Sequence, residues 1–151
     1  MKIHTLKIIG LFNLRNQLNQ ILNTHTTLKS KQKTGKLGEQ IAEKFLISRK
    51  FMILDRNFRT PFGEIDIVTQ HRNYIVFFEI KTRVSEKFGT PFSSITKTKQ
   101  KHILNNCLYY LKTHKLSIEN CRIDGIAIKL DLQKKFQTLK HLKNIITSPM
   151  L

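Results

Sequence analysis

Residues 63–81 have the sequence GEIDIVTQHRNYIVFFEIK, which predicts a two-stranded β-hairpin. Two runs rich in β-branched and aromatic residues, at about 64–70 and 74–83, are typical of strands. The polar tetrad 71–74 that joins them has a length that suits a hairpin turn. A sheet built around this hairpin is therefore the first expectation for the fold.

The hairpin brings charged side chains to one face. Successive side chains of a strand point to opposite faces, so Asp66 lies on one face of the first strand, and Glu79 and Lys81 share one face of the second. If Gln70 pairs with Ile75 across the turn, Asp66 lies opposite Glu79. Two carboxylates and an ammonium group then meet on a single face of the sheet.

Opposed carboxylates repel each other unless a cation neutralises them. Oxygen ligands from two carboxylates, completed by water and phosphate, suit Mg²⁺ or Mn²⁺. Such an ion polarises a phosphodiester and acidifies a bound water, and Lys81 is placed to orient or deprotonate that water. The set Asp66, Glu79 and Lys81 therefore predicts metal-dependent hydrolysis of phosphodiester bonds.

The rest of the chain supplies the other elements of a layered α/β domain. Thr34 is a candidate N-cap for the first helix, whose apolar stripe has Glu39 at its edge, whereas Glu43 is turned further toward solvent. Only Glu39 is thus expected to face a site. In order, the predicted elements are a helix at about 34–50, a strand at 51–58, the breaker 60–63, the hairpin, a helix at 94–114, and strands at 122–130 and 136–145, giving α-β-β-β-α-β-β.

Basic residues cluster beside the predicted carboxylates. Lys97, Lys99 and Lys101 lie near the start of the second helix, and we interpret Lys99 as a phosphate contact rather than a catalytic base. Arg83, just beyond the hairpin triplet, either clamps phosphate or is a solvated strand end. These four residues are the candidate nucleic-acid-binding set.

The charge balance of the whole chain favours a polyanionic partner. The 151 residues contain 27 Lys plus Arg against 10 Asp plus Glu, a formal net charge of +17 at pH 7. Each phosphate that such a surface neutralises releases counterions and adds affinity without sequence recognition. DNA is the expected partner, and a membrane phospholipid surface is the rival.

The chain divides into a basic extension, 1–33, and one domain, 34–147. The first acidic residue is Glu39, and the extension contains a candidate amphipathic helix at about 2–22. Its apolar run 8–12 is too short for a signal peptide or a membrane span. Cys107 and Cys121 have no metal-binding or disulfide spacing, so a reduced, cytoplasmic protein is expected.

Other polar residues have structural interpretations. We assign Glu64 a structural or supporting role, since it lies one pleat nearer the turn than Asp66. Asp124 is expected to be a buried partner of Arg122. Of the pair Tyr109-Tyr110, we expect one residue in the core and one at the surface, with base stacking as a minor alternative. The histidines form no pair at metal-ligand spacing.

Several ordered motifs resemble one bacterial family, the YraN family, which is identified as a member of the PD-(D/E)xK nuclease superfamily and is similar to Holliday junction resolvases. The likeness covers residues 35 to about 145. The matching pieces are Gly38-Glu39 with Ala42, Asn57-Phe58-Arg59, Gly63-Glu64-Ile65-Asp66, Phe78-Glu79-Ile80-Lys81-Thr82-Arg83, Phe88-Gly89, Lys99, and Arg122-Ile123-Asp124. Ile65 stands where the superfamily motif has proline, and the basic extension is absent from most members.

The resemblance implies a restriction-endonuclease-like fold, a mixed central sheet flanked by helices. It implies Asp66 and Glu79 as metal ligands, Lys81 as the catalytic lysine, and Glu39 as a further catalytic and metal-binding glutamate. The implied protein is a Mg²⁺-dependent endodeoxyribonuclease acting on branched DNA in repair or recombination, with no small-molecule cofactor. A homodimer is expected if the substrate is a four-way junction, because such a junction has two strands to cut. The alternative is a non-catalytic nucleic-acid-binding module of the same fold.

Overall fold

The computed structural model describes residues 31–84, 92 and 95–147. The elements are α2 (Lys31–Ser48), β1 (Met52–Thr60), β2 (Gly63–His71), β3 (Tyr74–Arg83), α3 (Lys97–Thr113), β4 (Cys121–Leu130) and β5 (Phe136–Ile146). Their order, α-β-β-β-α-β-β, confirms the order expected from the sequence.

The helix boundaries differ from the prediction by one to three residues at each end. Helix α2 already includes Lys31, so Thr34 lies inside the helix and is not its N-cap. Residues 31–33, which the sequence placed in the extension, continue this helix, and the predicted helix at 2–22 lies outside the described residues. Helix α3 does begin at a cap, because the Thr96 side chain accepts a hydrogen bond from the Lys99 backbone N–H.

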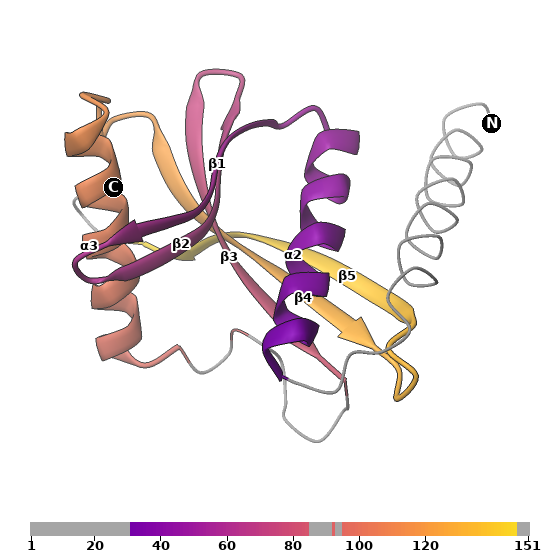
Figure 1. Cartoon of the computed structure of the whole chain (residues 1–151). Coiled ribbons are helices and arrows are strands. Elements are labelled where there is room, and N and C mark those ends of the chain that lie inside the picture. The colour runs from indigo at the N-terminus through magenta and orange to yellow at the C-terminus, as the bar shows by residue number, and fades with distance from the viewer. Residues whose placement is uncertain (1–30, 85–91, 93–94, 148–151) are drawn as a thin grey trace.

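A five-stranded mixed sheet in the order β1-β2-β3-β4-β5 separates the two helices (Figure 1). Strands β3 and β4 are parallel, and the other neighbours are antiparallel. Helix α3 is part of the crossover between β3 and β4, as a parallel pair requires. This is the mixed, helix-flanked sheet of the expected restriction-endonuclease-like layered domain.

Each helix covers its own part of the core. Leu37, Ile41 and Leu46 of α2 pack with Phe78 and Ile126 of the sheet. The second cluster, on the α3 side, is formed by Ile65, Val68, Phe77, Ile103, Cys107, Tyr110, Leu111, Cys121, Ile123 and Ile146. Burial of these apolar side chains on both faces fixes the two helices against the sheet. Tyr110 is buried while Tyr109 is 37% exposed, which confirms the expected division of that pair.

The hairpin register follows the sequence prediction along most of its length. Gln70 pairs with Ile75, and the ladder continues to Ile67 and Phe78. Within the part of the chain that the structure describes, no backbone pair joins Asp66 to Glu79, the next positions along. The strands diverge there, and this divergence leaves room for the Asp66 side chain.

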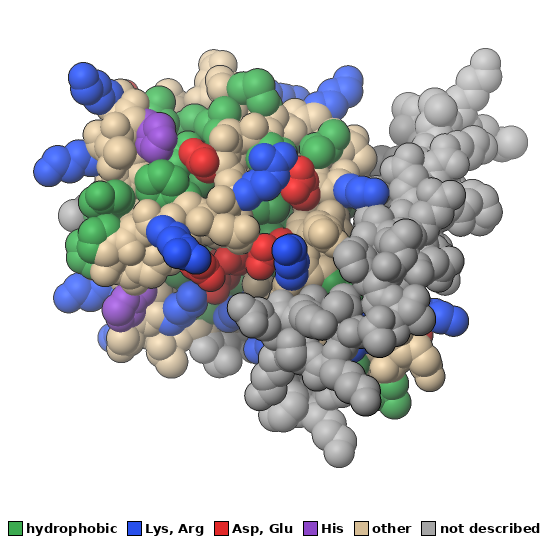
Figure 2. Space-filling view, viewed as in Figure 1, with side chains coloured by type: hydrophobic (Ala, Val, Ile, Leu, Met, Phe, Trp, Pro, Cys, Tyr) green, Lys and Arg blue, Asp and Glu red, His purple; other side chains and the backbone are tan. Residues whose placement is uncertain are grey.

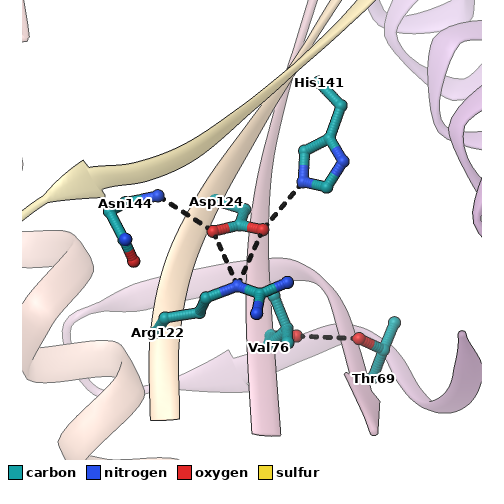
Figure 3. Close-up of polar contacts among 6 residues, drawn as sticks. All are labelled: Thr69, Val76, Arg122, Asp124, His141 and Asn144. Atoms are coloured by element: carbon teal, nitrogen blue, oxygen red, sulfur yellow. Dashed lines mark hydrogen bonds and ion pairs between the residues drawn. The ribbon is translucent and has the colours of Figure 1, made fainter. Parts of the chain in front are cut away.

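A buried ionic network ties β5 to β4 on the α2 side of the sheet (Figure 3). Asp124, with no exposed surface, accepts hydrogen bonds from Arg122 Nε at 3.1 and 3.2 Å and from the Asn144 backbone N–H at 3.0 Å. His141 Nε2 lies 2.7 Å from the same carboxylate. The pairing of Asp124 with Arg122 is confirmed, and the network links β4 to β5 through His141 and Asn144.

The helices of the described ranges include no segment long and apolar enough to cross a membrane.

Candidate active site

The divergent end of the β2–β3 hairpin opens into a cleft of about 580 Å³. Asp66 and Glu79 both line it, which brings together the two carboxylates that the sequence singled out. Figure 2 shows acidic side chains gathered on the face between α2 and α3, with Lys and Arg side chains around them. The full lining is Arg59, Thr60, Phe62, Gly63, Glu64, Asp66, Glu79, Ile80, Lys99, His102 and Asn106.

Asp66 is held in place by the neighbouring strand. The Ile80 backbone N–H donates a hydrogen bond to Asp66 Oδ2 at 2.6 Å. Burial and the negative charge of Glu79 raise the pKa of Asp66 to about 7, although the Ile80 hydrogen bond acts in the opposite direction. Glu39 and Glu64 raise it further. The site therefore concentrates negative charge in a protein that is otherwise strongly basic.

Glu79 has a cationic partner from α3. Lys99 Nζ lies 2.9 Å from Glu79 Oε1, and the Glu79 side chain is only 14% exposed. This contact differs from the phosphate role that the sequence suggested for Lys99, because the ammonium group is engaged by a carboxylate. An anion entering the cleft would still meet Lys99, which is 48% exposed.

Lys81 lies one pleat beyond Glu79, next to an aromatic ring. Its Nζ is 4.9 Å from the centre of the Phe92 ring, a cation–π contact. Burial lowers the pKa of Lys81, and the positive charges of Lys99 and Arg83 lower it further, although Glu79 raises it. The lowered pKa makes the Lys81 ammonium group easier to deprotonate, and only the neutral amine can accept a proton.

Glu39 stands apart from the two central carboxylates. It projects from α2, and Asn57 Nδ2 donates a hydrogen bond to Glu39 Oε2 at 2.9 Å. Its charge still acts on Asp66, whereas Glu43 is paired with Arg56 at 2.5 Å. Among the described residues, no three His, Cys, Asp or Glu side chains come together as a ready-made metal centre. The structure thus groups Asp66 with Glu79 and leaves Glu39 at the margin.

The donor set still fits a hard divalent cation. Asp66 and Glu79 offer carboxylate oxygens, and their mutual repulsion raises the pKa of Asp66. An ammonium group already lies on Glu79, so this position attracts positive charge. Carboxylate and water oxygens are the ligands that Mg²⁺ prefers. Asp66 and Glu79 are therefore the residues that would hold such an ion.

The remaining predicted basic residues take different positions. Lys97 and Lys101 line a second hollow, of about 480 Å³, together with Phe62, Thr98, His102 and Asn105. Arg83 is exposed at the end of β3. Lys99 alone of the predicted basic set lines the carboxylate cleft.

Sequence reasoning missed residues that reach the cleft from the β1–β2 turn and from α3. Arg59 lies near the end of β1, and Phe62 lies in the turn that follows, whose sequence was interpreted only as a chain breaker. His102 follows Lys99 by three residues, so helical spacing placed it on the same face and could have identified it. Asn106 is buried, bonds to Thr60 Oγ1, and donates to the Glu64 carbonyl at 3.3 Å. It fastens the turn to α3.

Comparison with known proteins identifies the family. Over 76% of this chain and 64% of the other, the fold is similar to SfsA of Pyrococcus furiosus in complex with Ca²⁺, with 15% identity and a TM-score of 0.36. UPF0102 proteins of Clostridium novyi and Thermodesulfovibrio yellowstonii are 41% and 43% identical to the chain, each over 73% of its length and 92% of theirs. The model of the family described as "Uncharacterised protein family UPF0102" matches residues 38–128. The chain therefore belongs to the UPF0102, or YraN, family.

Proposed function

We propose that this protein is a divalent-metal-dependent DNA endonuclease that hydrolyses phosphodiester bonds. The observation that carries the proposal is the pairing of Asp66 and Glu79 in one open cleft, with Lys99 on Glu79 and Lys81 one pleat away. In a strongly basic chain, a pair of half-buried acids in one cleft supports a role in binding a cation. Placement in the PD-(D/E)xK superfamily is part of this proposal.

The residues of the site have separate roles in the proposed hydrolysis. Asp66, fixed by the Ile80 N–H, and Glu79 would hold Mg²⁺ or Mn²⁺, which supplies charge neutralisation and acidifies a bound water. Lys81, whose pKa is lowered, accepts a proton from the water that attacks phosphorus. Lys99 can exchange its contact with Glu79 for a phosphate oxygen. Attack forms the new P–O bond as the P–O bond to the leaving sugar breaks, and that sugar oxygen takes a proton from solvent.

The proposed substrate is branched or otherwise structured DNA, in repair or recombination. On a four-way junction, two copies of the site are needed, so we propose a homodimer on that substrate. Glu39, whose charge reaches Asp66, would contribute to the metal site as the substrate binds. Arg83, Lys97 and Lys101 are proposed to contact the DNA backbone.

A non-catalytic binding module is the second candidate. The Lys99–Glu79 ion pair favours it, because an internal cation already neutralises one of the two carboxylates. In this alternative the basic surface binds nucleic acid and the acids only stabilise the cleft.

Cleavage assays separate the two candidates. Purified protein is incubated with end-labelled four-way junction, flap, single-stranded and duplex DNA, in Mg²⁺, Mn²⁺ or EDTA. The comparison is Lys81→Ala with Lys112→Ala, which removes an equal charge in the last turn of α3. Metal-dependent nicking that disappears only in Lys81→Ala supports the endonuclease. Tight binding without cleavage by any variant would support the binding module instead.

A further inference from the structure

An exposed aromatic side chain stands at the edge of the carboxylate cleft. Phe62, in the turn between β1 and β2, is 47% exposed. It lines both the cleft that contains Asp66 and Glu79 and the second hollow on α3, and His102 also lines both. The two hollows therefore adjoin at Phe62 and His102.

The turn that presents Phe62 is fastened in place. The Phe62 backbone N–H donates to Thr60 Oγ1 at 3.0 Å, and Thr60 Oγ1 in turn bonds to Asn106 of α3. The Phe62 ring meets Tyr109 edge to face, with ring centres 6.5 Å apart. Tyr109 is itself 37% exposed. An exposed ring held by such contacts is preorganised to receive a flat partner.

On the side of the second hollow, positive charge lies beside the same ring. Lys97 and Lys101 line the hollow beside Phe62, and no acidic side chain is among the described residues that line it. A flat apolar face with two ammonium groups beside it complements a nucleotide, whose base has a π-face and whose phosphate is anionic. A paired and stacked base in a duplex cannot present that face, so the occupant must be unpaired.

We propose that this hollow binds an unpaired nucleotide of the DNA strand beside the scissile phosphate, with its base stacked on Phe62 and its phosphate near Lys97 and Lys101. The proposal rests on the proposed nuclease function and narrows its substrate. The protein would act where single-stranded DNA adjoins the cleavage point, such as a flap, a gap or an open branch, and fully paired DNA would bind by charge alone.

The test measures binding in EDTA, so it does not depend on cleavage. The probes are a single-stranded oligothymidylate carrying one 2-aminopurine, whose fluorescence falls on stacking, and a fully paired duplex of the same length. The variants are Phe62→Ala, Phe62→Tyr, which keeps the ring, and Tyr74→Ala. Tyr74, the first residue of β3, is 43% exposed and serves as the matched control. Thermal unfolding of each variant verifies that it is folded.

We expect Phe62→Ala to lose the fluorescence quenching and to weaken single-strand binding about tenfold, with duplex binding unchanged. Phe62→Tyr and Tyr74→Ala should behave as the wild type does. Equal single-strand affinity and quenching in Phe62→Ala and the wild type would overturn the inference, and so would an equal loss of duplex binding. If the wild type binds in this way but cleaves nothing, the nucleotide site stands and the nuclease function fails. If the wild type cleaves DNA but Phe62→Ala quenches 2-aminopurine as the wild type does, the nuclease function stands and the nucleotide site fails.

Discussion

Gly38 of α2 lies against the side chain of Thr82 in β3. A β-carbon at position 38 would overlap Thr82 Oγ1 and come within 3.3 Å of its methyl group. Only glycine allows the helix backbone to approach the strand so closely. Because Glu39 is the next residue, this contact also sets how near Glu39 lies to Asp66.

Gly38→Ala should therefore destabilise the protein by about 1–3 kcal/mol, the usual cost of forcing an extra methyl group into a packed interior. The measurement is urea-induced unfolding. Gly35→Ala is the matched control, since it lies in the same helix with no neighbouring atom within 4 Å of the added β-carbon. That variant should gain up to about 1 kcal/mol from helix propensity. Equal effects at the two positions would contradict the close contact.

Asp124→Asn should cost about 3–5 kcal/mol at pH 7, because it removes a charge from a buried, fully paired network. Burial raises the pKa of Asp124, but bonds from His141 and Asn144 and the charge of Arg122 outweigh burial and hold this pKa below its usual value. The stabilisation is thus present above the unfolded-state pKa, near 4, and is lost as the pH falls through the lower folded-state pKa.

The stability difference between wild type and Asp124→Asn should consequently shrink at strongly acidic pH. Chemical unfolding at pH 7 and pH 2.5 measures it, to about half a kcal/mol. Glu119→Gln, an exposed carboxylate just before β4, provides the control and should change little at either pH. A cost for Asp124→Asn that is constant with pH would mean that the ionised form is not what stabilises the strand.

Asp66→Asn should leave the metal-free protein as stable as the wild type or stabilise it by on the order of 1–2 kcal/mol, since it removes a buried charge that Glu79 repels. We expect Mg²⁺ to raise the melting temperature of the wild type, and Asp66→Asn should abolish this rise. Thermal unfolding in EDTA and in MgCl₂ tests both effects. Glu64→Gln, an exposed carboxylate of the same cleft, should keep most of the Mg²⁺ effect. An unchanged Mg²⁺ shift in Asp66→Asn would exclude Asp66 as a ligand.

Lys99→Gln should have opposite effects on the affinities of the two proposed ligands of the cleft, the metal ion and DNA. Without the ammonium group on Glu79, Mn²⁺ should bind several-fold more tightly in the absence of DNA. DNA affinity in EDTA should fall, and the slope of log affinity against log salt should decrease by about one. Calorimetric titration and salt-dependent DNA binding measure these effects, with Lys112→Gln as the charge-matched control. Weaker Mn²⁺ binding would indicate that Lys99 supports the metal site.

The sequence predicts much of the central hairpin because strand alternation is a local property. The register that joins Gln70 to Ile75 follows from the turn, and the shared face of Asp66 and Glu79 follows from it. Strand alternation no longer predicts the contacts where the two strands diverge, beyond Ile67 and Phe78. The hydrogen bond from Ile80 to Asp66 depends on sheet twist, which no periodicity encodes.

Contacts between elements were also beyond sequence reasoning. The bond from Asn57 to Glu39 and the ring of Phe92 beside Lys81 require the docked arrangement of the fold. The position of the Phe62 turn also requires the docked fold, because Thr60 of this turn bonds to Asn106 of α3, 46 residues further along the chain. A breaker motif predicts that the chain turns, but it does not predict which residues the turn contacts.

The parallel pairing of β3 with β4 makes the cleft a late product of folding. Strands β1, β2 and β3 form sequential hairpins from neighbouring chain, whereas β4 is separated from β3 along the chain by the whole of α3. Such non-local pairings form slowly because loop closure precedes the contacts that compensate for it. Until then β3 has an open edge, and Glu79 lacks the helix that carries Lys99. A nascent chain thus carries both site acids before it carries α3 and β4, so the cleft is complete only when the whole domain has been made.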